Sequence, residues 1–121
     1  MRNNRTSGNA YERKIVNELK EIGFVDVVTS RAESRNMDAR KVDVFGKSLP
    51  IHIQCKNTKD VFKVSKYFEE NEEFFPEDKP LVIFHKKTKK AKTKFVTEGE
   101  FVYLKKESFY KLLEMLKKTY E

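Results

Sequence analysis

The feature that most constrains this chain is a pair of short segments with alternating apolar and polar residues, 42–45 (VDVF) and 51–56 (IHIQCK). Alternation with a period of two predicts two strands, joined here by a short turn. Successive side chains point to opposite faces of a strand, so Gln54 and Lys56 share a face, away from the apolar residues between them. Asp43, between two valines, is expected on the side opposite those valines. Pairing of the strands would gather Asp43, Gln54 and Lys56 around one point.

A carboxylate, an amide oxygen and an ammonium at one point form a site suited to a divalent metal beside a phosphodiester. The metal prefers oxygen ligands, polarises the phosphoryl oxygen and acidifies a water, while the lysine offsets negative charge on the transition state. The set lacks a second carboxylate. Glu12 supplies one if the amino-terminal helix packs against the sheet edge.

The rest of the sequence predicts helices and strands in alternation. Ser7 is expected to cap a helix over 7–22, and Gly23 to end it. The β-branched content of 24–29 predicts a strand, and the polar segment 30–40 a loop. Further expected elements are a turn at 57–60, a helix over 65–75 ended by Pro76, a buried strand at 81–84, a basic connection over 86–94, strands at 95–96 and 101–104 separated by 97–100, and a helix over 108–120 whose apolar side chains form one stripe.

This order of elements predicts an α/β or α+β fold in which helices cover a mixed sheet. A length of 121 residues suits one domain, residues 1–121, with residues 1–9 as a flexible basic arm. The single cysteine, Cys55, permits no internal disulfide and is expected to face the core rather than act as a nucleophile. No apolar run is long enough to cross a bilayer and no secretory signal is present, so a soluble, cytoplasmic protein without a membrane partner is expected.

Lys and Arg number 26 against 19 Asp and Glu, for a net charge of +7. Such a balance favours a polyanionic partner, usually nucleic acid, although a lysine-rich protein without such a partner has the same composition. Six lysines lie within 86–94. Either this segment is a solvated hairpin, or a phosphate backbone relieves the repulsion among its charges. The candidate phosphate contacts from charge alone are Lys86, Lys87, Lys89 and Lys90, with Arg2 and Arg5 on the arm.

Taken together, these motifs resemble the PD-(D/E)XK nuclease superfamily, and most closely the archaeal-type Holliday junction resolvases, including small phage-encoded versions. The motifs that carry the resemblance are Gly8-x-x-x-Glu12-Arg13, Gly23-Phe24 at the end of the first helix, Asp43, and Gln54-x-Lys56. They cover roughly residues 2–60. The resemblance implies a restriction-endonuclease-like fold, with a central mixed β-sheet flanked by helices.

The resemblance also implies a role for each matching residue. Asp43 is the central metal ligand, Gln54 the second ligand through its side-chain oxygen, Lys56 the catalytic lysine and Glu12 the helix-borne acid. The implied cofactor is Mg²⁺, for which Mn²⁺ can substitute. The implied phosphate or DNA contacts are Arg13 beside Glu12 and, from the loop after the first strand, Arg31, Ser34 and Arg35.

The implied activity is symmetric nicking of a four-way DNA junction by a homodimer, with no small-molecule substrate, leaving 5′-phosphate and 3′-hydroxyl ends. The dimer surface is expected among Phe62, Tyr67, Phe68 and Phe75. One departure opens two alternatives: the resolvases usually have Glu where this chain has Gln54. Mrr-like restriction endonucleases often read Gln-Cys-Lys here, which favours duplex cleavage, and loss of the metal would leave a non-catalytic DNA-binding module.

Overall fold

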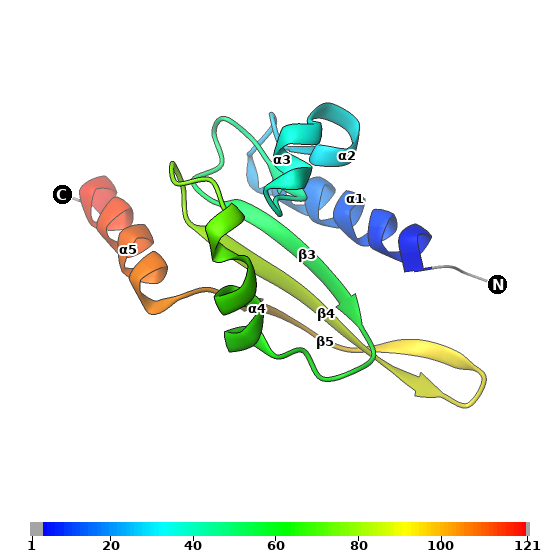
Figure 1. Ribbon diagram of the computed structural model, residues 1–121. Coiled ribbons are helices and arrows are strands. Elements are labelled where there is room, and N and C mark those ends of the chain that lie inside the picture. The colour runs from blue at the N-terminus through cyan, green and yellow to red at the C-terminus, as the bar shows by residue number, and fades with distance from the viewer. Residues whose placement is uncertain (1–3, 121) are drawn as a thin grey trace.

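A five-stranded mixed sheet, ordered β1-β2-β3-β4-β5, organises the chain into a mixed α/β structure (Figure 1). The computed structural model describes residues 4–120, with side chains from residue 9 onward. The strands are β1 (Val28–Thr29), β2 (Val44–Phe45), β3 (His52–Thr58), β4 (Leu81–Ala91) and β5 (Lys94–Tyr103). The helices are α1 (Asn4–Ile22), α2 (Ser30–Glu33), α3 (Arg35–Ala39), α4 (Val64–Asn71), the 3₁₀ turn η1 (Glu72–Phe74) and α5 (Lys106–Tyr120).

The strands run in sequence order across the sheet. β1, β2 and β3 pair antiparallel, β3 and β4 pair parallel, and β4 and β5 form an antiparallel hairpin. The parallel pair requires a crossover, which α4 provides. Two layers of helix cover the sheet: Figure 1 shows α4 in front of β3 and β4, and α1 behind them.

Each face of the sheet has its own apolar cluster. On the α1 face, Ile15 and Leu19 pack with Val44 and Ile53. On the α4 face, a second cluster comprises Val42, Phe68, Leu81 and Ile83. Along β3, Ile53 and Cys55 contribute to the first cluster, which confirms the predicted alternation and the inward orientation of Cys55. The polar face of β3 lies under α4 rather than in open solvent.

The end of α1 follows from a glycine. Gly23 adopts φ 126°, a conformation that costs other residues more, and its N–H donates to the carbonyl of Lys20 at 3.1 Å. The N–H of Phe24 donates to Leu19 at 3.0 Å, which completes a Schellman motif. The predicted helix end is confirmed. Its predicted start is wrong: α1 begins at Asn4, so Ser7 lies inside the helix, and residues 4–9, expected to belong to a flexible arm, are helical.

Residues 30–40 were expected to form a loop, and this prediction is wrong. They form α2 and α3. Ser34 separates the two helices in an extended conformation, and its hydroxyl accepts a hydrogen bond from the N–H of Met37 at 3.2 Å. This side-chain cap begins α3 in a segment too polar and too short to show apolar periodicity.

The carboxy-terminal half also differs from expectation. The segments 81–84, 86–94 and 95–104 form one long hairpin, because pairing with β4 extends β5 through 97–100. The apolar stripe of α5 is exposed: Phe109, Leu113 and Leu116 each expose about half of their surface, and α5 has no buried residue. In Figure 1, α5 lies beside the sheet at the end of an extended link. No helix in the described part of the chain is long and apolar enough to span a membrane.

Candidate active site

Asp43, the residue just before β2, is fixed by three hydrogen bonds. Its N–H donates to the carbonyl of Ile53 at 2.7 Å, and its carbonyl accepts from the N–H of Ser30 at 2.8 Å. Its carboxylate Oδ2 accepts from the backbone N–H of Cys55 at 2.8 Å. These bonds connect Asp43 to α2 and β3 at once, so the side chain, only 7% exposed, has a fixed position.

The end of a short strand explains this orientation. β2 pairs with β3 only at Val44 and Ile53, so the N–H of Cys55 lacks a backbone partner from β2. The carboxylate of Asp43 takes the place of the missing carbonyl. The expectation that Val42 and Val44 share a face is wrong: Val42 packs on the α4 side and Val44 on the α1 side. The reason is that β2 begins only at Val44, and the backbone before it does not alternate as a strand.

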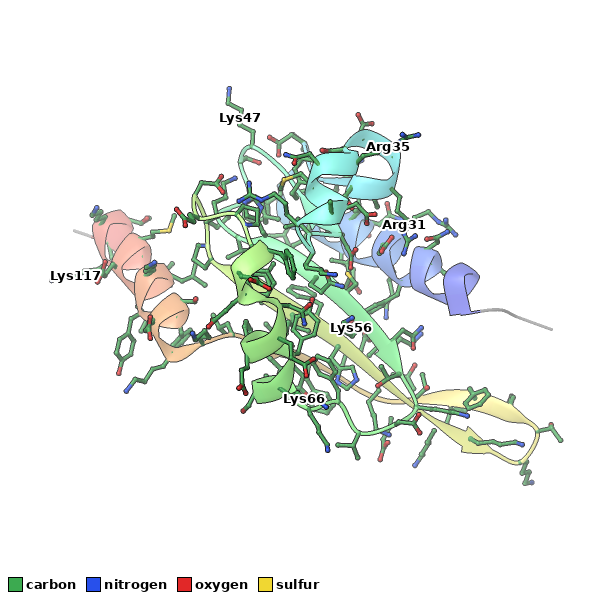
Figure 2. The ribbon with its side chains drawn as sticks, viewed as in Figure 1. Arg31, Arg35, Lys47, Lys56, Lys66 and Lys117 are labelled. Carbon is green, nitrogen blue, oxygen red and sulfur yellow. The ribbon has the colours of Figure 1, made fainter. Side chains whose placement is uncertain are left out.

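Glu12 approaches Asp43 from α1. It is buried, and both of its carboxylate oxygens accept hydrogen bonds from Nε of Arg31, at 2.8 and 3.2 Å. Arg31 lies on α2, which the Ser30–Asp43 hydrogen bond anchors. The side chain of Arg31 is 41% exposed, so its guanidinium pairs with Glu12 and remains accessible from solvent. Figure 2 shows Arg31 extending from α2 toward α1.

Lys56 contributes an ammonium from β3, two residues after Gln54 and on the same face. Its Nζ lies 4.8 Å from the ring centroid of Tyr67, a residue of α4. Burial lowers the pKa of Lys56, and the positive charge of Lys41 lowers it further, whereas the negative charge of Asp43 raises it. Lys56 lies over the middle of β3 in Figure 2.

The environment of Asp43 disfavours its negative charge. Burial raises its pKa to about 6, and the charge of Glu12 raises it as well. The hydrogen bond from Cys55 and the positive charges of Arg31 and Lys56 oppose this rise. A buried carboxyl with a raised pKa next to a second carboxylate is a place where an added cation would be stabilised.

The oxygen donors of the candidate residues are of the type that suits a hard divalent cation. It comprises the carboxylates of Glu12 and Asp43 and the side-chain oxygen of Gln54, which is buried and has no hydrogen-bond partner. The hydroxyl of Ser30, at the start of α2, is also buried without a partner. Within residues 4–120, no three His, Cys, Asp or Glu side chains form a metal-binding group, so the candidate set depends on the amide of Gln54. Carboxylate and amide oxygens are the ligands that Mg²⁺ and Ca²⁺ prefer.

The predicted DNA contacts are dispersed. Arg13 and Arg35 are exposed, on α1 and α3, whereas the hydroxyl of Ser34 caps α3. Arg2 lies outside the described residues, and for Arg5 only the backbone is described, within α1. Of the lysines, Lys89 and Lys90 are exposed near the end of β4. Lys86 lies 6.0 Å from the ring of Tyr11, and Lys87 pairs with Glu98 at 3.2 Å.

The two histidines have partners other than Glu12 and Asp43. His52 is buried, and its Nε2 lies 2.9 Å from Oδ1 of Asp78. His85 contacts the hydroxyls of Thr58 at 2.8 Å and Tyr103 at 3.3 Å. Burial raises the pKa of the Cys55 thiol, which disfavours a thiolate nucleophile. We therefore assign neither histidine and not Cys55 a role in the candidate site beside Asp43 and Lys56.

Tyr67 is a site residue that sequence reasoning missed. It was expected on an exposed dimer surface with Phe62, Phe68 and Phe75, and this prediction is wrong, because all four pack into the α4 cluster. The hydroxyl of Tyr67 is buried without a hydrogen-bond partner, and burial and the charge of Asp43 raise its pKa. The signal in the sequence was its position at helical spacing among apolar residues, which predicts burial but not contact with Lys56.

We expect Tyr67 to stabilise the charged form of Lys56. A cation over an aromatic ring in a desolvated setting gains about 1–2 kcal/mol, so Tyr67→Leu is expected to lower the pKa of Lys56 by roughly one unit. Tyr67→Phe keeps the ring and serves as the control, with an unchanged pKa. NMR titration of the Lys56 Cε and Nζ resonances measures both values. An unchanged or raised pKa in the leucine variant would show that the ring does not support the charge.

Comparisons of the chain with protein-family models, with curated proteins and with solved structures found no match.

Proposed function

We propose that the protein is a metal-dependent DNA endonuclease with a restriction-endonuclease-like fold, and that it resolves four-way junctions as a homodimer. The observation that carries the proposal is that Glu12 of α1, Asp43 just before β2 and Lys56 of β3 influence one another electrostatically, and that the Asp43 carboxyl among them is buried and has a raised pKa. A buried carboxyl with a raised pKa beside charged neighbours is typical of catalytic sites. The mixed sheet with helices on both faces is the arrangement that the resemblance implies.

In this proposal each residue of the site has a separate role in the cleavage of a phosphodiester. Glu12, Asp43 and Gln54 would hold Mg²⁺, which when bound polarises the phosphoryl oxygen and acidifies water. The ammonium of Lys56 would offset the negative charge that develops on the phosphoryl oxygens. The guanidinium of Arg31 keeps Glu12 in place and, being partly exposed, can also donate to a phosphate oxygen.

Two-fold symmetry suits a four-way junction, because two symmetry-related strands must be cut together. Net charge +7 supports a nucleic-acid partner, since each cation placed near a phosphate releases counterions. The neutral Gln54 in place of a carboxylate favours a second candidate, cleavage of linear duplex as in the Mrr-like endonucleases.

Cleavage of a synthetic four-way junction and of its matched linear duplex, each with Mg²⁺ and with EDTA, tests the proposal. Paired symmetric nicks in the junction, present with Mg²⁺ and absent with EDTA, are the expected result. Efficient cutting of the linear duplex would favour the restriction-type alternative. Tight binding without cleavage in Mg²⁺ or Mn²⁺ would contradict an enzymatic role and favour a DNA-binding module.

A further inference from the structure

The far end of the β4–β5 hairpin projects from the body of the protein. Here residues 88–97 are called the basic ribbon. Figure 1 shows the ribbon extending past the end of β3, where neither α1 nor α4 covers it. Its two strands are closed by the two-residue loop Lys92-Thr93, in which Lys92 adopts φ 58°. The ribbon is therefore a two-stranded element with solvent on both faces.

The charge of the ribbon is of one sign. Lys89, Lys90, Lys92 and Lys94 are exposed, and the sequence has no acidic residue from 86 to 97. Within residues 4–120, none of these four ammonium groups has an ion-pair partner, in contrast to Lys87, which pairs with Glu98 at the base of the ribbon. Unpaired like charges at this density repel one another, and an anionic partner would relieve the repulsion.

The lysines are distributed over both faces of the ribbon. Residues directly opposite each other in an antiparallel pair point to the same side. Lys89 is opposite Val96, and Lys90 is opposite Phe95, so Lys89 and Lys90 lie on different faces. Lys94, opposite Ala91, shares the face of Lys89. Because the ribbon has cations on both faces, it is better suited to bind in a groove with two anionic walls than on a single flat anionic surface.

The ribbon is also placed to reach DNA bound at the candidate active site. His85 of β4 is in register with Lys56, and Lys92 follows seven residues later. At about 3.3 Å per residue, the tip lies roughly 23 Å along the strand from the level of Lys56. This is about two-thirds of the 34–36 Å helical repeat of B-DNA. A register shift between Lys87 and Thr88 marks a bulge at the base, a feature that changes the direction of a hairpin.

We propose that the basic ribbon enters the major groove of a duplex DNA arm next to the cleaved phosphate, with its lysines on the phosphates of both groove walls. The inference rests on the proposed function for its partner, duplex DNA. The major groove is about 12 Å wide and admits a two-stranded β-ribbon. The exposed ring of Phe95, on the face of Lys90, would contact apolar base edges such as the thymine methyl group.

The test is DNA binding in EDTA, so that it does not depend on cleavage. The ribbon variant carries K89T, K90T, K92G and K94T. Threonine favours strands, and glycine tolerates the positive φ at position 92, so the hairpin is retained. The slope of log K against log[salt] for a four-way junction with duplex arms is expected to fall in magnitude by roughly 3–4 for each protomer bound, about 0.9 for each phosphate that a lysine no longer neutralises. Dimethyl sulfate protection of guanine N7, which lies in the major groove, is expected to disappear.

A matched control removes the same charge elsewhere. K20A, K106A, K111A and K118A remove four exposed lysines from α1 and α5. This control is expected to keep the N7 protection and most of the salt slope. Equal loss of slope in the control, or N7 protection that survives in the ribbon variant, would overturn the inference while leaving the cleavage test of the proposed function untouched.

Two further measurements separate the groove from general attraction to phosphate. Phe95→Ser is expected to weaken DNA binding several-fold without changing the salt slope, because it removes an apolar side chain and no charge. A-form duplex RNA has a deep, narrow major groove that side chains cannot read. The ribbon variant and the parent protein are therefore expected to bind duplex RNA with similar slopes of log K against log[salt]. An equal fall of slope on RNA would contradict docking in the major groove.

Discussion

Replacing Lys56 by alanine is expected to lower the rate of junction cleavage by roughly 10²–10³-fold, with little change in junction affinity. The physical reason is the position of its ammonium beside the Asp43 carboxyl, under α4, where it can offset charge on the phosphate. A group that acts on charge developed in the transition state contributes to the rate more than to ground-state binding. Single-turnover cleavage and a binding titration in EDTA measure the two effects separately.

Lys66→Ala is the matched control for this experiment. Lys66 is an exposed lysine on α4 that pairs with Glu70 at 3.8 Å, and its replacement removes the same charge. The control is expected to cleave at nearly the parent rate. Normal cleavage by the Lys56 variant, or an equal loss in both variants, would show that Lys56 has no specific role.

Asp43→Asn is expected to stabilise the protein near pH 8 by about 2–3 kcal/mol. The pKa of Asp43 is raised from 3.8 to about 6 in the folded state. Between these values the folded state keeps a proton that the unfolded state has released, so the free energy of unfolding falls as the pH rises through this window. Each pKa unit corresponds to about 1.4 kcal/mol. Above about pH 6 the protein retains the full cost of a buried charge, which asparagine removes.

Thermal unfolding of the parent and of Asp43→Asn at several pH values measures this effect. A gain of roughly 10 °C in Tm is expected at pH 8, and the gap should shrink as the pH falls toward 4. The same variant is expected to lose cleavage, so it is more stable and inactive. A variant that is less stable at pH 8, or a gap that does not vary with pH, would show that the Asp43 charge is well compensated in the parent protein.

Local signals in the sequence account for the parts of the site that lie on adjacent strands. Alternation predicted that Gln54 and Lys56 share a face, and a short turn predicted that Asp43 lies close to this strand. The structure brings Asp43 against Cys55, the residue between them. Gly23 was sufficient to predict the end of α1, because the Schellman motif depends on only a few consecutive residues.

Contacts between distant segments account for what the sequence could not predict. The ring of Tyr67 meets Lys56 only because α4 crosses over β3. Arg31 was expected near phosphate, and its ion pair with Glu12 depends on how α2 is oriented after β1. Residues 97–100 look like a turn in isolation, but pairing with β4 keeps them extended. The interpretation of Val42 and Val44 failed because a two-residue strand is too short for alternation to hold across its start.

Binding of Mn²⁺ to the site, followed by electron paramagnetic resonance, tests the central claim most directly. Lys56→Ala serves as the background variant, because it keeps Glu12, Asp43 and Gln54 as donors. It also prevents DNA cleavage when Mn²⁺ binding is measured with a four-way junction present. Adding Asp43→Asn to this background removes one carboxylate ligand. We predict saturable Mn²⁺ binding in the single variant and at least roughly tenfold weaker binding in the double variant. Equal Mn²⁺ affinity in the two proteins would contradict a metal site at Asp43.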